Sequence, residues 1–326
     1  GMWWKLVNRN KRTVALDLKL PDDLRVLHDL LADAHVLVEN FRPGTLERLG
    51  LGPDVLLARN PHLVITRVTG FGQTGPYAGR PGFATIAEVM SGLSAISGLP
   101  DGQPLLPPIA LTDEVTGVVA AFATMVALHS GRGQVVDVSL LESLFQLMGP
   151  LIGLYRLTGQ EQPRLGAGLP YSVPRGTYRC ADGKWLAVGA IEPRFHDLLI
   201  DKLELSPEVF AERWNSEQWP HLRQLLTDTF LTRKRSEWCA VLEGSDACVA
   251  PVLDMDEAPV HPHNQARQTF VRHAEVIQPA PAPRFSRTPA QIQRAPAMPG
   301  EHGEEILRDW GFGSDWIDRL KACGAL

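Results

Sequence analysis

The sequence has few cysteines, no long hydrophobic run and no large excess of charge. Its four cysteines, Cys180, Cys239, Cys248 and Cys323, include no C-x-x-C pair, which is typical of reduced thiols in the cytoplasm. The longest apolar run, Val118 to Leu128, is far shorter than the ~20 residues that span a bilayer, so we expect no membrane segment. No signal peptide precedes the first charged residues. These absences predict a soluble, cytoplasmic protein.

Net charge is small as well. The formal charge of −5 argues against a surface that binds nucleic acid, although local basic clusters can hold the phosphates of a small molecule. The chain has 326 residues, of which 44% are hydrophobic and 21% are charged. This is ordinary globular composition, and the length is typical of two domains rather than one.

The first half of the sequence alternates strand and helix patterns. Short apolar runs predict strands at 14–18, 35–39, 63–68 and 135–138. Apolar periodicity predicts a helix that begins at Pro21, further helices at 44–50, 53–60 and 116–129, and an apolar helix that ends near residue 157. Because helices connect successive strands, we expect right-handed crossovers and a parallel sheet.

The pattern changes after a segment rich in glycine, proline and arginine. Two β runs flank Ala181-Asp-Gly183, which is typical of a hairpin, and amphipathic helices and another β run, Cys248 to Leu253, follow. We therefore expect four parts: a large α/β domain at 1–158, a linker at 159–176, a small α+β domain at 177–277, and a linker with C-terminal helices at 278–326 that return to the large domain.

A glycine-rich loop, Gly70-Phe-Gly72-Gln-Thr-Gly75, follows a predicted strand and fits the pattern G-x-G-x-x-G. A dinucleotide site needs a helix that begins at this loop, so that the helix N-terminus faces the pyrophosphate. Here two prolines and two more glycines follow, and no helix can begin before about Ala84. The segment therefore predicts a plain glycine loop and argues against a nicotinamide dinucleotide.

The segment Leu111-Thr-Asp113-Glu-Val-Thr-Gly117 precedes a predicted buried helix. Thr112 or Asp113 could simply cap this helix, because both residue types accept hydrogen bonds from free N–H groups. The same position would keep a carboxylate ionised and available as a nucleophile, since a helix N-terminus stabilises negative charge. The two roles are compatible, and the motif alone does not choose between them.

Basic residues form a second candidate site. The cluster Asn8 to Arg12 is followed by Lys19, Arg42 and Arg48. Scattered Lys and Arg are usually solvated. However, Lys19, Arg42 and Arg48 all come after the first two predicted strands, where open α/β sheets place their ligands, so phosphate binding is the alternative.

The remaining candidates lie in the second half. Gly166 and Gly168 are either plain linker or a loop that offers backbone N–H groups to an oxyanion. Glu192 follows a predicted strand and is expected to begin a helix. The pair His261-Pro-His263 lacks the i, i+4 spacing of a helical zinc site, so we expect no metal.

Several ordered blocks together resemble the class III CoA-transferase family, which includes formyl-CoA transferase and carnitine CoA-transferase and has the α-methylacyl-CoA racemases as relatives. The resemblance runs from Asn8 to the C-terminus. It is carried by NRNKRTVALDL, VLVENFRPGTLERLGL, GFGQTGPYAGRPGF, LTDEVTG, GRGQVVDVSLLES, PRGTYRCADGKW, QARQTF and APRFSRTPA.

The resemblance implies a Rossmann-like large domain that binds CoA, a small domain across long linkers, and an interlocked homodimer. The family's nucleophilic aspartate matches Asp113, which would move CoA between an acyl-CoA and a free carboxylic acid through covalent aspartyl intermediates. CoA would be a substrate and not a permanently bound cofactor. The family's CoA contacts match Leu16, Asp17, Leu18, Lys19, Asn40, Phe41, Arg42, Arg48, Pro81, Gly82, Phe83 and Ala84, and its glycine loop corresponds to the region of Gly166 and Gly168.

Two departures from the family pattern matter. The first strand–helix unit of the family has no counterpart before Asn8, so a CoA-binding protein without catalysis is one alternative. The small domain is most similar to racemases, and Glu192 matches an acidic residue near the racemase site, so racemisation of a 2-methylacyl-CoA is the other alternative. A racemase needs two proton-transferring groups, and its histidine falls at Phe83, which cannot move a proton. CoA transfer is therefore the preferred hypothesis.

Overall fold

The chain divides into two compact units in the computed structural model, which describes residues 1–166, 173–273 and 275–322. The first unit contains 1–91, 108–147 and 259–326, and the second contains 92–107 and 148–258. These units differ from the expected domains because the chain leaves the first unit twice. Residues 92–107 and 148–158 belong to the second unit, and residues 259–277 belong to the first.

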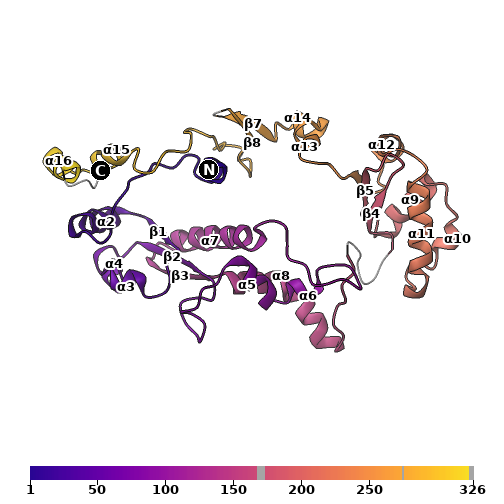
Figure 1. Cartoon of the computed structure of the whole chain (residues 1–326), viewed down its shortest axis with the longest axis horizontal. Helices are drawn as coiled ribbons and strands as arrows, with labels where there is room; N and C mark the ends of the chain where they lie inside the picture. The colour runs from indigo at the N-terminus through magenta and orange to yellow at the C-terminus, as the bar shows by residue number, and fades with distance from the viewer. Residues whose placement is uncertain (167–172, 274, 323–326) are drawn as a thin grey trace. The chain divides into compact units, whose positions relative to one another are not determined.

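Three parallel strands form the sheet of the first unit, in the order β1-β2-β3 (Figure 1). Val64 of the central strand pairs with Val36 on one side and with Gln134 on the other. The strands are β1 (Val36–Glu39), β2 (Val64–Thr69) and β3 (Gln134–Ser139). The expected strands at 35–39, 63–68 and 135–138 and their parallel pairing are thus confirmed.

The helices and the remaining hairpin of the first unit are α1 (Met2–Val7), α2 (Pro21–Asp33), α3 (Thr45–Arg48), α4 (Pro53–Arg59), α5 (Ala84–Met90), α7 (Leu111–His129), the start of α8 (Leu140–Thr158), the second half of α13 (Glu257–Val260), α14 (Pro262–Ala266), β7 (Phe270–His273), β8 (Val276–Pro279), α15 (Gly303–Asp309) and α16 (Ser314–Ala322). α5 begins at Ala84, so no helix follows the glycine loop directly. This confirms the prediction that the loop lacks the helix of a dinucleotide site.

The contacts of two neighbouring side chains on β2 show which helices cover each face of the sheet. Ile65 lies in a leucine core built with α2, α3 and α4. Thr66 points the other way, and its hydroxyl shares a buried 2.6 Å hydrogen bond with the hydroxyl of Thr124 on α7. Since successive strand residues face opposite sides, α7 covers the face opposite to α2 and α4 (Figure 1).

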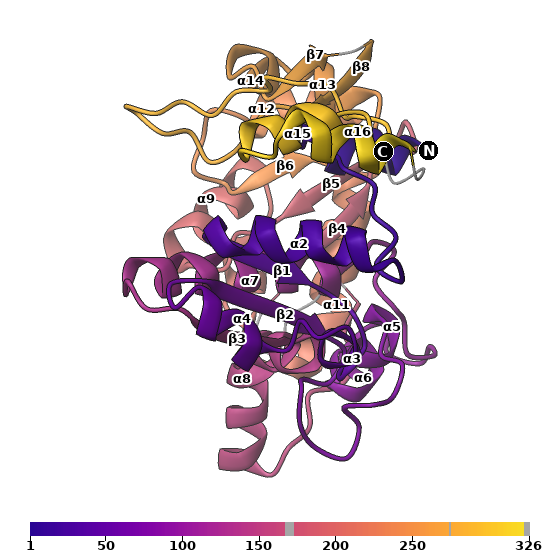
Figure 2. The same cartoon turned by 90° about the vertical axis from the view of Figure 1, so that its left-hand side faces the viewer.

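The C-terminal segment belongs to the first unit. α15 and α16 lie on the same side of the sheet as α2 (Figure 1 and Figure 2). Their buried side chains form a core with Val26 of α2, and Leu16 packs against that core. The predicted strand at 14–18 is wrong. The chain turns at Asp17, whose carbonyl accepts a 2.9 Å hydrogen bond from the Leu20 N–H, and Leu16 faces the C-terminal helices rather than a neighbouring strand.

The second unit has a small antiparallel sheet in the order β4-β5-β6. A core that includes Tyr178, Phe210, Phe230 and Trp238 lies between this sheet and the helices. The hairpin predicted around Ala181-Asp-Gly183 is confirmed. The elements are α6 (Leu93–Ile96), β4 (Gly176–Arg179), β5 (Trp185–Val188), α9 (Pro193–Lys202), α10 (Pro207–Phe210), the 3₁₀ helix η1 (Ser216–Gln218), α11 (Trp219–Phe230), α12 (Arg235–Leu242) and β6 (Val249–Pro251).

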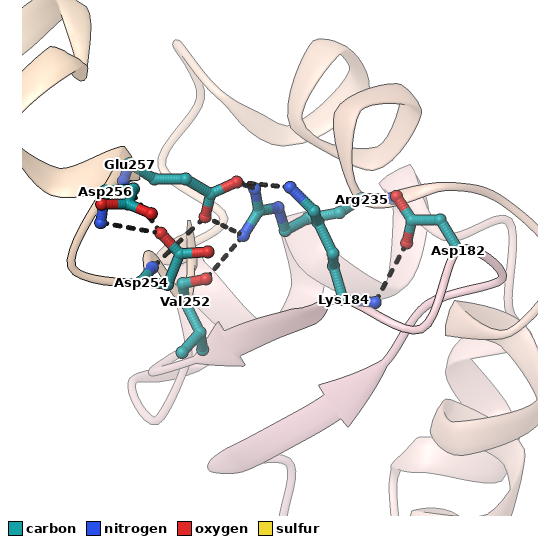
Figure 3. A network of polar contacts seen from close by, with 7 residues as sticks. All are labelled: Asp182, Lys184, Arg235, Val252, Asp254, Asp256 and Glu257. Atoms are coloured by element: carbon teal, nitrogen blue, oxygen red, sulfur yellow. Dashed lines mark hydrogen bonds and ion pairs between the residues drawn. The ribbon is translucent and has the colours of Figure 1, made fainter.

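A network of charged groups joins the hairpin, α12 and the segment after β6 in the second unit (Figure 3). The Arg235 guanidinium donates to both carboxylate oxygens of Glu257, at 2.9 and 2.5 Å, and to the carbonyl of Val252 at 2.6 Å. The Lys184 ammonium donates to the same carboxylate. The Arg235 and Lys184 hydrogen bonds lower the pKa of Glu257 to about 2. Glu257 therefore holds three separate chain segments together as long as it is ionised.

Replacing Glu257 by glutamine is expected to lower the free energy of unfolding of the second unit at neutral pH. It should also remove the part of the pH dependence of this free energy that Glu257 causes. A carboxyl whose folded-state pKa is depressed stabilises the fold above its ordinary value of 4.5, and the stabilisation disappears as pH falls toward 2. Urea unfolding at several pH values should show that the free energies of unfolding of the variant and the parent protein converge as pH falls from 4.5 toward 2. Glu212→Gln, at an exposed glutamate of the same unit, is the matched control. A difference in free energy of unfolding between Glu257→Gln and the parent protein that stays the same at all pH values would contradict this account.

Candidate active site

A cleft of about 280 Å³ opens in the first unit beside the carboxyl ends of β1 and β2. This is the edge at which open α/β sheets bind ligands. The cleft is lined by Asn40, Phe41, Arg42, Pro43, Val68, Thr69, Gly70, Ala78, Arg80, Pro81, Gly82, Phe83, Asp113 and Leu140. Seven of the residues singled out in the sequence, from three separate segments, thus meet in one cavity: Asn40, Phe41, Arg42, Pro81, Gly82, Phe83 and Asp113.

Asp113 reaches the cleft from the first turn of α7. The helix begins at Leu111 with Ala110 as its N-cap, and no side chain caps it. The prediction that Thr112 or Asp113 caps the helix is therefore wrong, because both residues lie inside the first turn. Asp113 is exposed, and no hydrogen bond or ion pair of its carboxylate is found among the described residues. It is a carboxylate near the positive end of a helix dipole, with its oxygens available to a ligand.

The first turn of α7 is anchored from a neighbouring helix. The hydroxyl of the buried residue Thr112 donates a 2.9 Å hydrogen bond to the carboxylate of Glu88 on α5, which is itself buried. α5 begins directly after Phe83, which lines the cleft. One buried hydrogen bond thus connects the two segments that present Phe83 and Asp113. It also explains why Thr112 does not act as a cap.

Two glycines in contact bring the loop after β2 back to the cleft. A Cβ atom at Gly70 would lie 2.6 Å from the Cα of Gly82, and a Cβ atom at Gly82 would lie 2.9 Å from the Cα of Gly70. Real Cβ atoms do not approach backbone this closely, so both positions require glycine. This contact holds Pro81 and Phe83 at the end of β2.

Two guanidinium groups line the cleft. Arg42 follows β1 and was singled out in the sequence, whereas Arg80 was not. Arg80 stacks on Tyr77, with 3.9 Å from its guanidinium carbon to the ring centroid, and Tyr77 in turn packs edge-on against Phe71. No carboxylate partner of either arginine is found among the described residues. The only sequence signal for Arg80 was its place directly before the matched stretch Pro81 to Ala84.

Other predicted CoA contacts lie outside this cavity. Leu16, Asp17, Leu18 and Lys19 are not among its lining residues, and Asp17 instead binds its own turn, where its carboxylate accepts from the Lys19 N–H at 3.0 Å. Since the predicted first strand is absent, Lys19 does not follow a strand end. Arg48 donates to the hydroxyl of Thr45 at 2.8 Å, and Ala84 begins α5.

Two further candidates, Gly166 and Glu192, belong to the second unit. Gly166 has a left-handed backbone with φ of +58°, and its N–H donates to the carbonyl of Gly98 at 2.8 Å. Glu192 is the exposed N-cap residue of α9, so it does begin a helix as expected. Gly168 lies outside the described residues. Among the described residues, no group of three or more His, Cys, Asp or Glu is placed to hold a metal ion.

Residues 1–303 match the family described as CoA-transferase family III, and the chain belongs to this family. Alpha-methylacyl-CoA racemase from Mus musculus is 38% identical over 325 residues, which are 96% of this chain and 84% of that protein. Succinyl-CoA–D-citramalate CoA-transferase from Chloroflexus aurantiacus is 34% identical over 336 residues, which are 98% of this chain and 84% of that protein. The resemblance read from the sequence is thus confirmed.

Solved structures agree with this assignment. The crystal structure of a CAIB/BAIF family protein from Brucella suis superposes with a TM-score of 0.84 and 26% sequence identity, covering 95% of this chain and 84% of that one. The mixed α/β fold with a parallel sheet and further small sheets is therefore that of the CaiB/BaiF proteins. Both CoA-transferases and racemases occur among the relatives, so the family identifies an enzyme acting on CoA thioesters without choosing between these reactions.

Proposed function

We propose that the protein transfers CoA between an acyl-CoA and a free carboxylic acid, with Asp113 as the covalent nucleophile. The observation that carries the proposal is an exposed carboxylate at the start of α7, in the same cleft as six of the twelve residues that match the family's CoA contacts. A nucleophile must be accessible and ionised, and Asp113 is a carboxylate near the positive end of a helix. Arg42 and Arg80 supply two positive charges for the phosphates of CoA.

The steps balance as two displacements in each half-reaction. The Asp113 carboxylate attacks the thioester carbon of the donor, which forms a mixed anhydride and releases CoA thiolate. The thiolate then attacks the aspartyl carbon of the anhydride, which leaves an aspartyl-CoA thioester and frees the donor acid. The acceptor carboxylate repeats both steps in reverse, forms the new acyl-CoA and restores Asp113. Dividing the transfer in this way replaces one difficult step between two substrates by easier steps through covalent intermediates.

Racemisation of a 2-methylacyl-CoA is the second candidate, and the 38% identity to alpha-methylacyl-CoA racemase favours it. Racemisation requires a proton acceptor on one face of the α-carbon and a proton donor on the other. Asp113 could supply one of them. The resemblance described for the sequence implies that Phe83 stands where racemases have a histidine, and this residue is 79% exposed and lines the same cleft. Since a phenyl ring transfers no proton, we prefer CoA transfer.

A single assay in D₂O separates the two reactions. The protein is incubated with succinyl-CoA and, separately, a 2-methylacyl-CoA, each with malate, citramalate or glutarate as acceptor, and mass spectrometry follows new CoA thioesters and deuterium at the α-carbon. Transfer predicts new thioesters and, after hydroxylamine treatment, a hydroxamate at Asp113. Racemisation predicts deuterium incorporation without exchange of the CoA partner. Neither signal with any pair would leave only a CoA-binding role, which titration calorimetry with CoA would test.

We further propose that a second copy of the chain covers the outer face of α7, as in the homodimer expected from the family. Val118, Phe122 and Met125 follow each other at helical spacing on this face and are exposed by 70, 71 and 63%. The opposite face of α7 is buried. An apolar stripe of this kind marks an interaction surface.

A lipid bilayer is the other possible occupant of this face. Among the described residues, α7 is the helix whose length and composition would allow it to cross a membrane. However, its buried face contacts β2 and β3 of an open parallel sheet. Open sheet edges do not occur in the hydrocarbon region of a bilayer, so a protein partner fits this helix better.

A further inference from the structure

A charged cluster lies next to the residues that line the cleft, toward the carboxyl ends of β1 and β2. It consists of Arg67 on β2, Glu39 at the end of β1, and Glu47 on α3. Arg67 and Glu39 are only 4 and 6% exposed. The Arg67 Nε donates to Glu39 Oε1 at 2.7 Å, and its two terminal nitrogens donate to the oxygens of Glu47 at 2.7 and 3.3 Å. The guanidinium is therefore satisfied by two carboxylates.

The second oxygen of Glu39 holds the loop that forms one wall of the cleft. The N–H of Phe41 donates to Glu39 Oε2 at 2.7 Å. Phe41 belongs to Asn40–Pro43, the four consecutive residues that line this side of the cavity. Glu39 itself does not line the cavity. Each of its oxygens accepts one charge-assisted hydrogen bond, one from the sheet and one from the loop.

We propose that Glu39 is a positioning residue that fixes the loop Asn40–Pro43 against the sheet and thereby shapes the CoA-binding wall of the cleft. This inference rests on the proposed CoA-binding function and adds a residue to it that does not contact the ligand. Arg67 holds Glu39 in place. Glu47 accepts from the terminal nitrogens of Arg67 on the exposed side, and no hydrogen bond between Glu47 and the loop is found among the described residues.

The geometry makes the carboxylate difficult to replace. Glutamine has one acceptor oxygen, whereas Glu39 uses both of its oxygens as acceptors. In Glu39→Gln, either the Arg67 Nε–H or the Phe41 N–H would face the amide NH₂ group, and one buried donor would lose its partner. In Glu47→Gln, Arg67 loses one charge partner as well, but the loop contact is unaffected. The two variants therefore differ in the loop contact.

The test compares Glu39→Gln with Glu47→Gln by two measurements. Hydrogen–deuterium exchange of the peptide containing Phe41 measures the protection given by the loop contact and requires no activity. Calorimetry with free CoA measures the affinity of the cleft for CoA. In Glu39→Gln, the peptide that contains Phe41 should exchange faster, and CoA should bind on the order of tenfold more weakly. KM for the acyl-CoA should rise by a larger factor than kcat falls. Glu47→Gln should retain the exchange rate and CoA affinity of the parent protein. Glu39→Asp, which keeps both oxygens, should recover part of the affinity.

The outcomes separate the inference from the proposed function. Unchanged exchange in Glu39→Gln, or equal effects of both variants, would overturn the positioning role. Faster exchange with unchanged CoA affinity would show that the loop does not form the CoA wall, while activity of the parent protein would leave the transferase proposal standing. If the parent protein neither binds CoA nor transfers it, the proposed function fails and the inference fails with it. Should Glu39→Gln fold poorly by circular dichroism, the same comparison uses Glu39→Asp.

Discussion

Replacing Asp113 by asparagine is expected to reduce CoA transfer by at least about a thousandfold, because no mixed anhydride can form on an amide. The substitution preserves the shape of the side chain, and Asp113 makes no hydrogen bond or ion pair among the described residues that the change could break. Stability and CoA binding should therefore remain close to those of the parent protein. A selective loss of turnover is the signature of a residue that acts in the chemical step rather than in binding.

The neighbouring residue provides the control for this prediction. Glu114 is exposed in the same turn of α7 but does not line the cleft. Glu114→Gln removes the same charge at almost the same distance from the helix end, so it reproduces the general electrostatic effect without the nucleophile. Steady-state rates and hydroxylamine trapping should show an active Glu114→Gln and an Asp113→Asn protein without adduct. Turnover by Asp113→Asn within about tenfold of the parent would rule out a covalent role for Asp113.

The second large effect is expected at the outer face of α7. Phe122→Asp should convert the proposed dimer to monomer at micromolar concentration, since burying an unpaired carboxylate in an apolar interface costs about 3 kcal/mol or more, or about a hundredfold in affinity. Phe122 is exposed within one chain, so the folded monomer should tolerate the aspartate. Sedimentation velocity measures the change directly.

A matched substitution tests whether the effect belongs to this face. Val55 on α4 is 51% exposed in the same unit, and Val55→Asp introduces the same charge away from α7. It should leave the oligomeric state unchanged. A parent protein that is monomeric over the same concentration range, or a Phe122→Asp protein that remains dimeric, would contradict the proposed interface. Co-sedimentation of the parent protein with anionic lipid vesicles would then identify a membrane surface as the occupant of this face.

The sequence predicted those elements whose signals are local. The helix beginning at Pro21, the two short helices before β2, the parallel strands and the hairpin around Ala181-Asp-Gly183 all carry their periodicity, proline or turn residues within a few positions. Asp113 was recognised from the pattern around it, and its proposed role as nucleophile came from a resemblance over several separate segments. These features depend on which residues stand next to one another along the chain.

The errors arose where distant residues compete for the same groups. Thr112 looked like a helix cap, but its hydroxyl is bonded to Glu88, which lies 24 residues earlier in the chain. The apolar run at 14–18 resembled a strand, but Leu16 packs against the C-terminal helices. Neither competitor can be seen from local spacing, because packing partners are chosen by the fold as a whole.

By itself the sequence determined the class of fold, the family and the carboxylate proposed to carry the chemistry. Only the tertiary structure decided which predicted contacts share one cavity, that Arg80 joins Arg42 there, and that Glu39 holds the loop from the end of β1. The physical reason is that strand and helix patterns depend on neighbours along the chain. A cleft, in contrast, depends on contacts such as that between Gly70 and Gly82, and on buried charges that pair across separate elements.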